Sequence, residues 1–127
     1  MVGVVLDTNA AIAVMKFEPS ILRTLQDRDV FLSMMALGEL YFGAYNSQRL
    51  SKNLSNIDAL IRTSTILPMN LETSQVFGQI RTQLKKMARP IPVNDIWIAA
   101  CAKEHGLQLV MRDGHFRHVS GLETIAW

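Results

Sequence analysis

Short segments dominated by apolar residues occur at five places along the chain. Runs of this length that are rich in β-branched residues are typical of strands buried on both faces of a parallel sheet. The predicted strands are Val2–Leu6, Val30–Ser33, Thr65–Met69, Leu107–Met111 and Leu122–Ala126. Pro68 places the third near a strand end or at a sheet edge, because proline donates no hydrogen bond to a neighbouring strand.

Between these runs, apolar residues recur every three or four positions, which predicts amphipathic helices. The clearest case is Gln48–Thr63, whose apolar positions are Leu50, Leu54, Ile57 and Ile61. Further helices are predicted over Asn9–Lys16, Ser20–Gln26, Met35–Ser47, Glu72–Met87 and Asp95–His105. Ser20 and Asn94 are predicted N-caps, and Gly106 is predicted to follow the last helix.

Strands that alternate with helices predict an α/β fold, with a mostly parallel sheet covered by helices on both faces. The sequence contains no repeat, no low-complexity segment and no linker long enough to divide it, so we expect a single domain over residues 1–127. The composition agrees, because a chain of 127 residues that is 49% hydrophobic can bury a substantial core.

The formal net charge of +2 permits a polyanionic partner but does not imply one. Cys101 is the only cysteine, which excludes an internal disulfide and a cysteine-rich zinc site, and its helical context predicts a small buried side chain. The N-terminal apolar run is too short for a signal peptide, and no apolar stretch reaches the roughly 18 residues of a membrane span. We therefore expect a soluble cytoplasmic protein with no membrane partner.

Four of the eleven acidic residues interrupt or border apolar segments. Asp7 ends the first predicted strand and Asp113 lies two residues beyond the fourth, while Glu39 and Asp95 lie early in predicted helices. Functional groups of an open parallel sheet collect at the carboxyl ends of its strands, so a single rim can gather all four. The other seven acids are expected at the surface or in helix caps: Glu18, Asp27, Asp29, Asp58, Glu72, Glu104 and Glu123.

Each of the four acids also has a purely structural explanation. Asp7 and Asp95 could favour the positive end of a helix dipole. Glu39 could be solvated, and Asp113 could be a turn residue. Three of them are nevertheless embedded among apolar residues, where carboxylates repel one another and lose hydration. A divalent cation removes both costs, and ligands that are all oxygen favour Mg²⁺ or Mn²⁺ over zinc.

These four segments carry a family resemblance. The chain resembles the PIN-domain nucleases and, within them, the VapC-type toxins of bacterial toxin–antitoxin pairs. The match rests on LDTN with Asp7, on SMMALGELYFGA with Glu39, on IPVNDIWIAACAKEHG with Asp95, and on LVMRDGHFRHVSGL with Asp113. It covers essentially the whole chain, and the four segments occur in the family's order.

The resemblance implies a three-layer α/β/α domain around a sheet of about five strands. It also implies a metal-dependent endoribonuclease that uses one or two Mg²⁺ or Mn²⁺ ions, cleaves RNA such as tRNA or rRNA and so inhibits translation. The implied partners are the RNA substrate, a cognate antitoxin that covers the active site, and a second copy of the chain in a homodimer or in a toxin–antitoxin hetero-oligomer.

By this resemblance Asp7 and Asp95 are direct metal ligands, while Glu39 and Asp113 act through water. Thr8 and Asn9 match the family's positions beside the first acid and are expected to support it by hydrogen bonding or by fixing the turn. The sequence departs from the family in two places. Met111 replaces a Ser or Thr that often precedes the fourth acid, and Ala36 replaces a Thr that often opens the helix of the second.

Basic residues supply candidate RNA contacts. Arg112 could bind RNA phosphate or pair with Asp113. The run that ends before Asp95 could line a phosphate track or form an ordinary solvated helix face, and its candidates are Lys85, Lys86 and Arg89. His115 and His118 are expected to be solvated loop residues. Apolar residues around Tyr41 exceed what one helix face can bury, which indicates a groove for an antitoxin helix.

Three other functions remain open from the sequence. The first is a PIN-like nuclease in RNA processing or DNA metabolism with no toxin role. The second is a phosphoacceptor or phosphatase that uses Asp7, although Asn9 stands where the second acid of its usual DxDxT motif would be. The third is a non-catalytic interaction domain, which the four intact acids oppose.

Overall fold

The computed structural model describes residues 2–127, which contain one five-stranded sheet. Every pair of neighbouring strands runs parallel, in the order β3-β2-β1-β4-β5. The strands are β1 (Val2–Leu6), β2 (Arg28–Ser33), β3 (Thr65–Leu67), β4 (Gln108–Met111) and β5 (Thr124–Ala126). All five predicted runs therefore form strands, and β3, which ends before Pro68, is an edge strand as expected.

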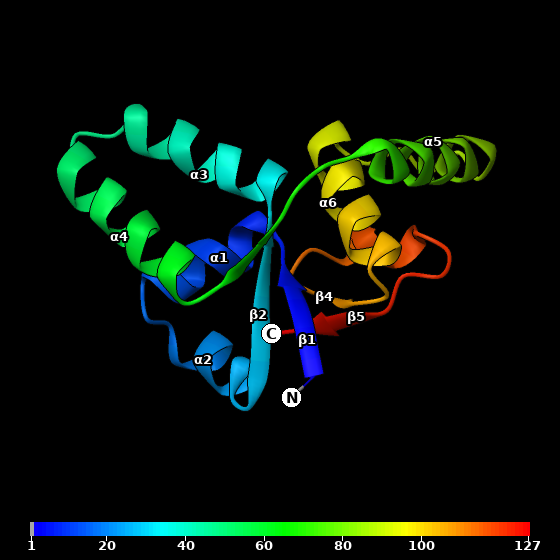
Figure 1. Ribbon diagram of the computed structural model, residues 1–127. Helices are drawn as coiled ribbons and strands as arrows, with labels where there is room; N and C mark the ends of the chain where they lie inside the picture. Colours follow the sequence, from blue (N-terminus) through cyan, green and yellow to red (C-terminus); the bar gives the residue numbers. More distant parts are fainter. Residues whose placement is uncertain (1) are drawn as a thin grey trace.

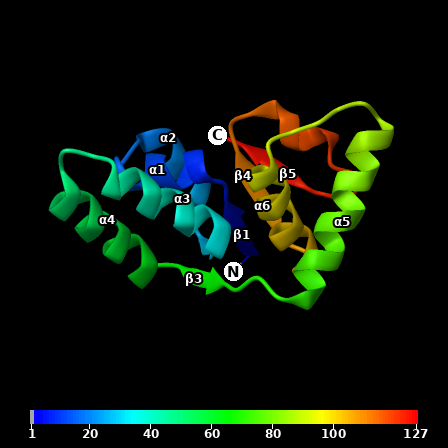
Figure 2. The same ribbon diagram turned by 90° about the horizontal axis from the view of Figure 1, so that it is seen from above.

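Helices connect the strands throughout the described residues. They are α1 (Thr8–Met15), α2 (Pro19–Leu25), α3 (Met34–Tyr45), α4 (Leu50–Arg62), α5 (Leu71–Lys86), α6 (Val93–Glu104) and a short 3-10 helix, η1 (Gly114–His118). Figures 1 and 2 show α1–α4 on one side of the sheet and α5 and α6 on the other. The predicted three-layer α/β/α architecture is confirmed. Within residues 2–127, no helix has both the length and the apolarity needed to cross a membrane.

The strand order creates a switch point between β1 and β4. From β1 the chain moves outward to β2 and then β3, and it later returns to β4 and β5 on the other side. The centre of the sheet is fully buried, as Val5 and Leu6 of β1 and Leu109 of β4 show. In open parallel sheets, ligands bind outside the carboxyl ends of the strands at such a point. Asp7 and Asp113 follow the two strands that flank it.

Two predicted helix caps are wrong. Ser20 lies inside α2, which begins at Pro19, because proline's fixed φ and missing N–H suit the first helical position. Asn94 lies inside the first turn of α6, which begins at Val93. Gly106 does follow α6, and its φ of 65° is the left-handed conformation that commonly ends a helix.

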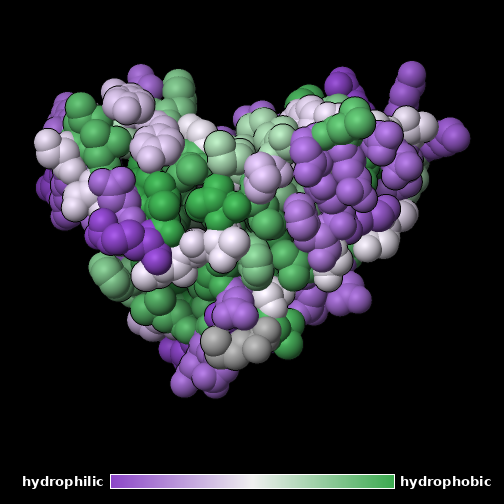
Figure 3. Space-filling view, in the orientation of Figure 1, coloured by the Kyte–Doolittle hydropathy of each residue, from purple (hydrophilic) through white to green (hydrophobic). Residues whose placement is uncertain are grey.

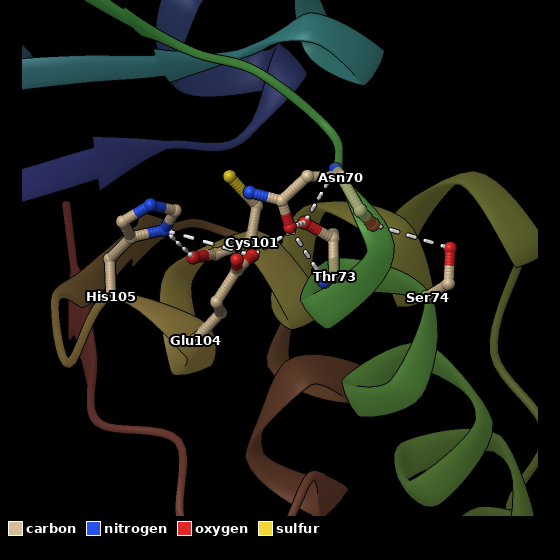
Figure 4. Close-up of polar contacts among 6 residues, drawn as sticks. All are labelled: Asn70, Thr73, Ser74, Cys101, Glu104 and His105. Atoms are coloured by element: carbon tan, nitrogen blue, oxygen red, sulfur yellow. Dashed lines mark hydrogen bonds and ion pairs between the residues drawn. The ribbon is translucent and has the colours of Figure 1, made fainter.

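Glu104 is not a surface acid, contrary to the sequence expectation. Its side chain is only 5% exposed and accepts a 2.6 Å hydrogen bond from Thr73 Oγ1 of α5. Thr73 is itself fully buried and forms a capping box with Asn70 at the start of α5. Figure 4 shows how this contact ties the beginning of α5 to the end of α6. Cys101 is buried as predicted, and burial raises the pKa of its thiol to about 12.

Candidate active site

The four predicted acids line a single cavity of about 280 Å³. Each comes from a different element. Asp7 follows β1, Glu39 lies on α3, Asp95 lies on α6, and Asp113 precedes η1. The remaining lining residues are Thr8, Asn9, Pro92, Asn94, His115 and Phe116. The fold therefore gathers, at the switch point of the sheet, the acids that the motifs single out.

Asp7 is the most buried of the four, with 3% of its surface exposed. Its Oδ1 accepts a 2.7 Å hydrogen bond from the Ala10 N–H, so Asp7 is the N-cap of α1. This cap occupies one carboxylate oxygen and leaves the other available. Loss of hydration on burial raises the pKa of Asp7 from 3.8 to about 6, and the charges of Asp95 and Asp113 add to this effect.

Thr8 fixes the position of Glu39. Its Oγ1 donates a 2.6 Å hydrogen bond to Glu39 Oε1 across 31 residues of sequence. The helix that presents Glu39 begins at Met34, and Ser33 caps it by accepting a 3.1 Å hydrogen bond from the Ala36 N–H. The helix therefore begins before Ala36, and the hydroxyl of Ser33 caps it.

Asp95 lies in the first turn of α6, with a side chain that is 22% exposed. Burial is the main cause that raises its pKa, and the negative charges of Glu39 and Asp113 act in the same direction. His115 opposes them. Two carboxyls of this cavity therefore have raised pKa values, which marks a site where negative charge is concentrated and incompletely solvated.

His115 connects two of the acids. Its ring Nδ1 lies 3.0 Å from Asp113 Oδ2, and its Nε2 lies 2.9 Å from Asp95 Oδ2. Its backbone N–H donates a 3.2 Å hydrogen bond to Asp113 Oδ1, which makes Asp113 the N-cap of η1. Only 22% of the His115 side chain is exposed, so the prediction of a solvated loop histidine is wrong.

The sequence contained one feature that could have identified this residue. His115 follows Asp113 by only two positions, a spacing at which the ring can return to the acid across a tight turn. Its approach to Asp95, however, depends on how α6 packs against β4, and no local pattern encodes that packing.

The donor set suits a hard divalent cation, because the carboxylates supply oxygen ligands, and burial together with neighbouring negative charge raises the pKa of Asp7 and of Asp95. Within residues 2–127, no three His, Cys, Asp or Glu side chains already converge as a ready-made metal site. The His115 ring lies between the oxygens of Asp95 and Asp113.

Comparison with known proteins agrees with this geometry. The PIN domain family matches residues 4–122. The chain belongs to the PIN-domain family. The tRNA(fMet)-specific endonuclease VapC of Shigella flexneri is 32% identical over 131 aligned residues, which cover 100% of this chain and 99% of that protein. The ribonuclease VapC2 of Haemophilus influenzae is 33% identical over 131 aligned residues, which again cover 100% of this chain and 99% of that protein.

Solved structures share the fold of this PIN domain. DNA-bound VapBC from Salmonella typhimurium superposes with a TM-score of 0.89 and 26% identity, and the match covers 100% of this chain and 99% of that one. The curated relatives place this PIN domain among the VapC ribonucleases, as its four motifs predict.

The basic residues that the sequence suggests as RNA contacts lie in two different parts of this PIN domain. Arg112 lies 3.6 Å from the centre of the Trp127 ring and 3.8 Å from Glu18, so the pairing with Asp113 considered from the sequence is not the one observed. Lys85 lines a separate open hollow with the start of α6. Lys86 and Arg89 are exposed nearby at and beyond the end of α5. Met111 is buried at the end of β4 and adds no polar group to the acidic cavity.

Two apolar hollows adjoin the acidic cavity of the PIN domain. One, of about 240 Å³, lies between α1, α3 and α4 and includes Ile12, Leu40 and Ile57. The other lies along α3 toward α6, where Met34 and Phe42 are exposed. Both hollows include Glu39. Figure 3 shows hydrophobic side chains on the face that is hollowed between α3 and α4 on one side and α5 and α6 on the other.

Proposed function

We propose that residues 1–127 form a single catalytic domain, a Mg²⁺- or Mn²⁺-dependent endoribonuclease that acts as the toxin of a type II toxin–antitoxin pair. The observation that carries this proposal is the meeting of four carboxyls from four elements in one cavity. The raised pKa values of Asp7 and Asp95 support it, because the two carboxyls are short of compensating positive charge. A bound divalent ion would supply that charge, polarise the phosphodiester and activate water for attack.

The side chains have distinct parts in this mechanism. Asp7 and Asp95 would hold the ion, and Asp7 is kept rigid because one of its carboxylate oxygens caps α1. Glu39 orients the attacking water, and Thr8 fixes Glu39 through the 2.6 Å hydrogen bond. Asp113 acts from the edge of the cavity, where its side chain is 56% exposed. Asn9 lines the cavity and supports the turn after Asp7.

The substrate in this proposal is structured RNA of the tRNA class. The relative from Shigella flexneri is named as a tRNA(fMet)-specific endonuclease and matches this chain over its whole length. The candidate contacts to phosphates are the exposed Lys85 and Lys86 at the end of α5, Arg89 in the connection to α6, and Arg112.

The proposed protein partner is an antitoxin whose apolar segment occupies the hollows beside Glu39. The solved VapBC structure from Salmonella typhimurium, which this chain resembles in fold, supports the pairing. A segment that binds along Phe42 and Leu40 would extend over the acidic cavity, because Glu39 lines both hollows and the cavity as well. Homodimers or toxin–antitoxin hetero-oligomers are the assemblies expected, and light scattering of the purified protein with and without antitoxin distinguishes them.

The decisive experiment compares the wild type with Asp95→Asn on purified tRNA. Wild-type cleavage should stop in EDTA and return with Mg²⁺ or Mn²⁺, whereas Asp95→Asn should stay inactive with either ion. Asp58→Asn, on an exposed face of α4, is the matched control and should cleave normally. Cleavage by a well-folded Asp95→Asn protein would exclude the proposed site, and cleavage in EDTA would exclude the metal.

A further inference from the structure

His115 makes more contacts with the acidic cavity than any role as a turn residue requires. The backbone N–H and ring Nδ1 both engage Asp113, at 3.2 Å and 3.0 Å. The ring Nε2 reaches the carboxylate of Asp95, on a different helix, at 2.9 Å. One side chain thus contacts two of the four acids and lies between them.

The segment that presents His115 is firmly anchored. Phe116 is 1% exposed, and its ring lies 4.6 Å from the imidazole, measured between ring centres. On the other side of η1, Gln83 of α5 donates to the His118 carbonyl at 2.9 Å and accepts from the Ser120 N–H at 3.1 Å. The imidazole is therefore held in the cavity by the packing of η1.

The contact with Asp95 is close but imperfect. Nε2 is buried and, despite the 2.9 Å separation, forms no hydrogen bond of good geometry. A buried polar nitrogen without a directional partner is unusual in a native protein. Because the contact is short but poorly aligned, it can be given up at smaller cost than a well-aligned hydrogen bond.

We propose that His115 is a positioning residue that takes the place of the divalent cation in the metal-free protein. Its ring engages Oδ2 of Asp95, a carboxyl proposed to hold the ion, and Oδ2 of the neighbouring Asp113. The inference rests on the proposed metal-dependent function. The ring and the ion compete for Asp95, so His115 weakens ion binding and, in exchange, holds Asp95 and Asp113 together when no ion is bound.

Competition of this kind has two measurable consequences. Removal of the ring frees Asp95 for the ion, so the affinity for Mn²⁺ should rise about tenfold, which is about the effect of one charge-assisted contact. Removal of the ring also leaves the carboxylates without their partner, so the metal-free protein should melt at a lower temperature. A residue with a merely structural role would lower the melting temperature without tightening the binding of Mn²⁺.

The test titrates Mn²⁺ into metal-free protein at one fixed pH, with free Mn²⁺ measured by electron paramagnetic resonance. The variants are His115→Asn and His115→Leu, and His118→Asn is the matched control on the same short helix. Both His115 variants should bind Mn²⁺ about tenfold more tightly than the wild type, with a larger rise in melting temperature on addition of the ion. His118→Asn should match the wild type in both measurements.

The outcomes separate this inference from the proposed function. If the wild type binds Mn²⁺ and cleaves RNA but neither His115 variant binds the ion more tightly, the competition is overturned and the nuclease stands. If the wild type neither binds Mn²⁺ nor cleaves RNA, both are overturned. Circular dichroism in the absence of metal verifies that each variant is folded, and His115→Asn, which retains a polar side chain, carries the test if His115→Leu does not fold.

Discussion

Replacement of Asp7 by asparagine is expected to stabilise the metal-free protein while it abolishes cleavage. Burial raises the pKa of Asp7 from 3.8 to about 6, which means that the folded state disfavours its ionised form. Asparagine is neutral and nearly isosteric, and its side-chain oxygen can still accept the Ala10 N–H that caps α1. The variant therefore loses the unfavourable charge and keeps the cap.

The magnitude follows from the two pKa values. Because the folded pKa is the higher one, Asp7 contributes its full stability below pH 4, and this contribution is lost as the pH rises through about 6. A difference of about two pKa units corresponds to about 3 kcal/mol at neutral pH. For a domain of this size that is roughly 10 °C in Tm.

The assay is thermal denaturation in EDTA at a series of pH values from about 4 to 8. The Tm of Asp7→Asn should equal that of the wild type near pH 4 and exceed it increasingly above pH 6. Asp58→Asn, which changes an exposed carboxyl, should show no such divergence. Mg²⁺ should narrow the gap by stabilising the wild type alone. If the wild type and Asp7→Asn still have the same Tm at pH 7.5 in EDTA, burial does not disfavour the ionised form of Asp7 and the reasoning is refuted.

Three further substitutions probe other contacts. Thr8→Val removes the 2.6 Å hydrogen bond to Glu39 and should lower kcat/KM for RNA cleavage about tenfold with little loss of stability. Thr73→Val leaves the buried Glu104 carboxyl without its donor, so urea denaturation should show a loss of about 1–3 kcal/mol while cleavage persists. Lys85→Ala should reduce the slope of log affinity for tRNA against log salt by about 0.7–0.9, measured by fluorescence anisotropy in EDTA.

Each of these predictions has a matched control. Thr8→Ser keeps a hydroxyl and should retain most activity. Thr82→Val lies on the exposed face of α5 and should cost less stability than Thr73→Val. Lys52→Ala removes an exposed positive charge from α4 and should leave the salt slope unchanged. Equal effects of any test variant and its control would contradict the specific contact assigned to it.

Local patterns determined the fold class and the order of elements. Short, mainly apolar segments predicted all five strands, and recurrent apolar positions predicted the ends of the six α-helices within one or two residues. Ser20 does not cap α2 because Pro19, whose preset φ suits the first helical position, begins that helix. Asn94 does not cap α6 because Pro92 is already the N-cap, and its ψ of 140° lies outside the helix that begins at Val93. Asn94 is instead part of the cavity lining.

The candidate acids were also accessible from the sequence, because a carboxylate among apolar residues is conspicuous in any local window. That explains why Asp7, Glu39 and Asp95 could be named together, and the place of Asp113 two residues beyond the fourth predicted strand added it to the set. The assignment of Glu104 failed for the complementary reason. Its surroundings in the sequence are polar, and only the packing of α6 against α5 buries it.

The tertiary structure alone decided which side chains act on these acids. Thr8 meets Glu39, and Thr73 meets Glu104, across 31 residues in each case. His115 meets Asp95 only because η1 and the start of α6 converge at the switch point between β1 and β4. Periodicity and residue type describe how one segment folds and which face it buries. They carry no information about the partner that a polar group finds when two distant segments pack, and such partners set the charge balance of this cavity.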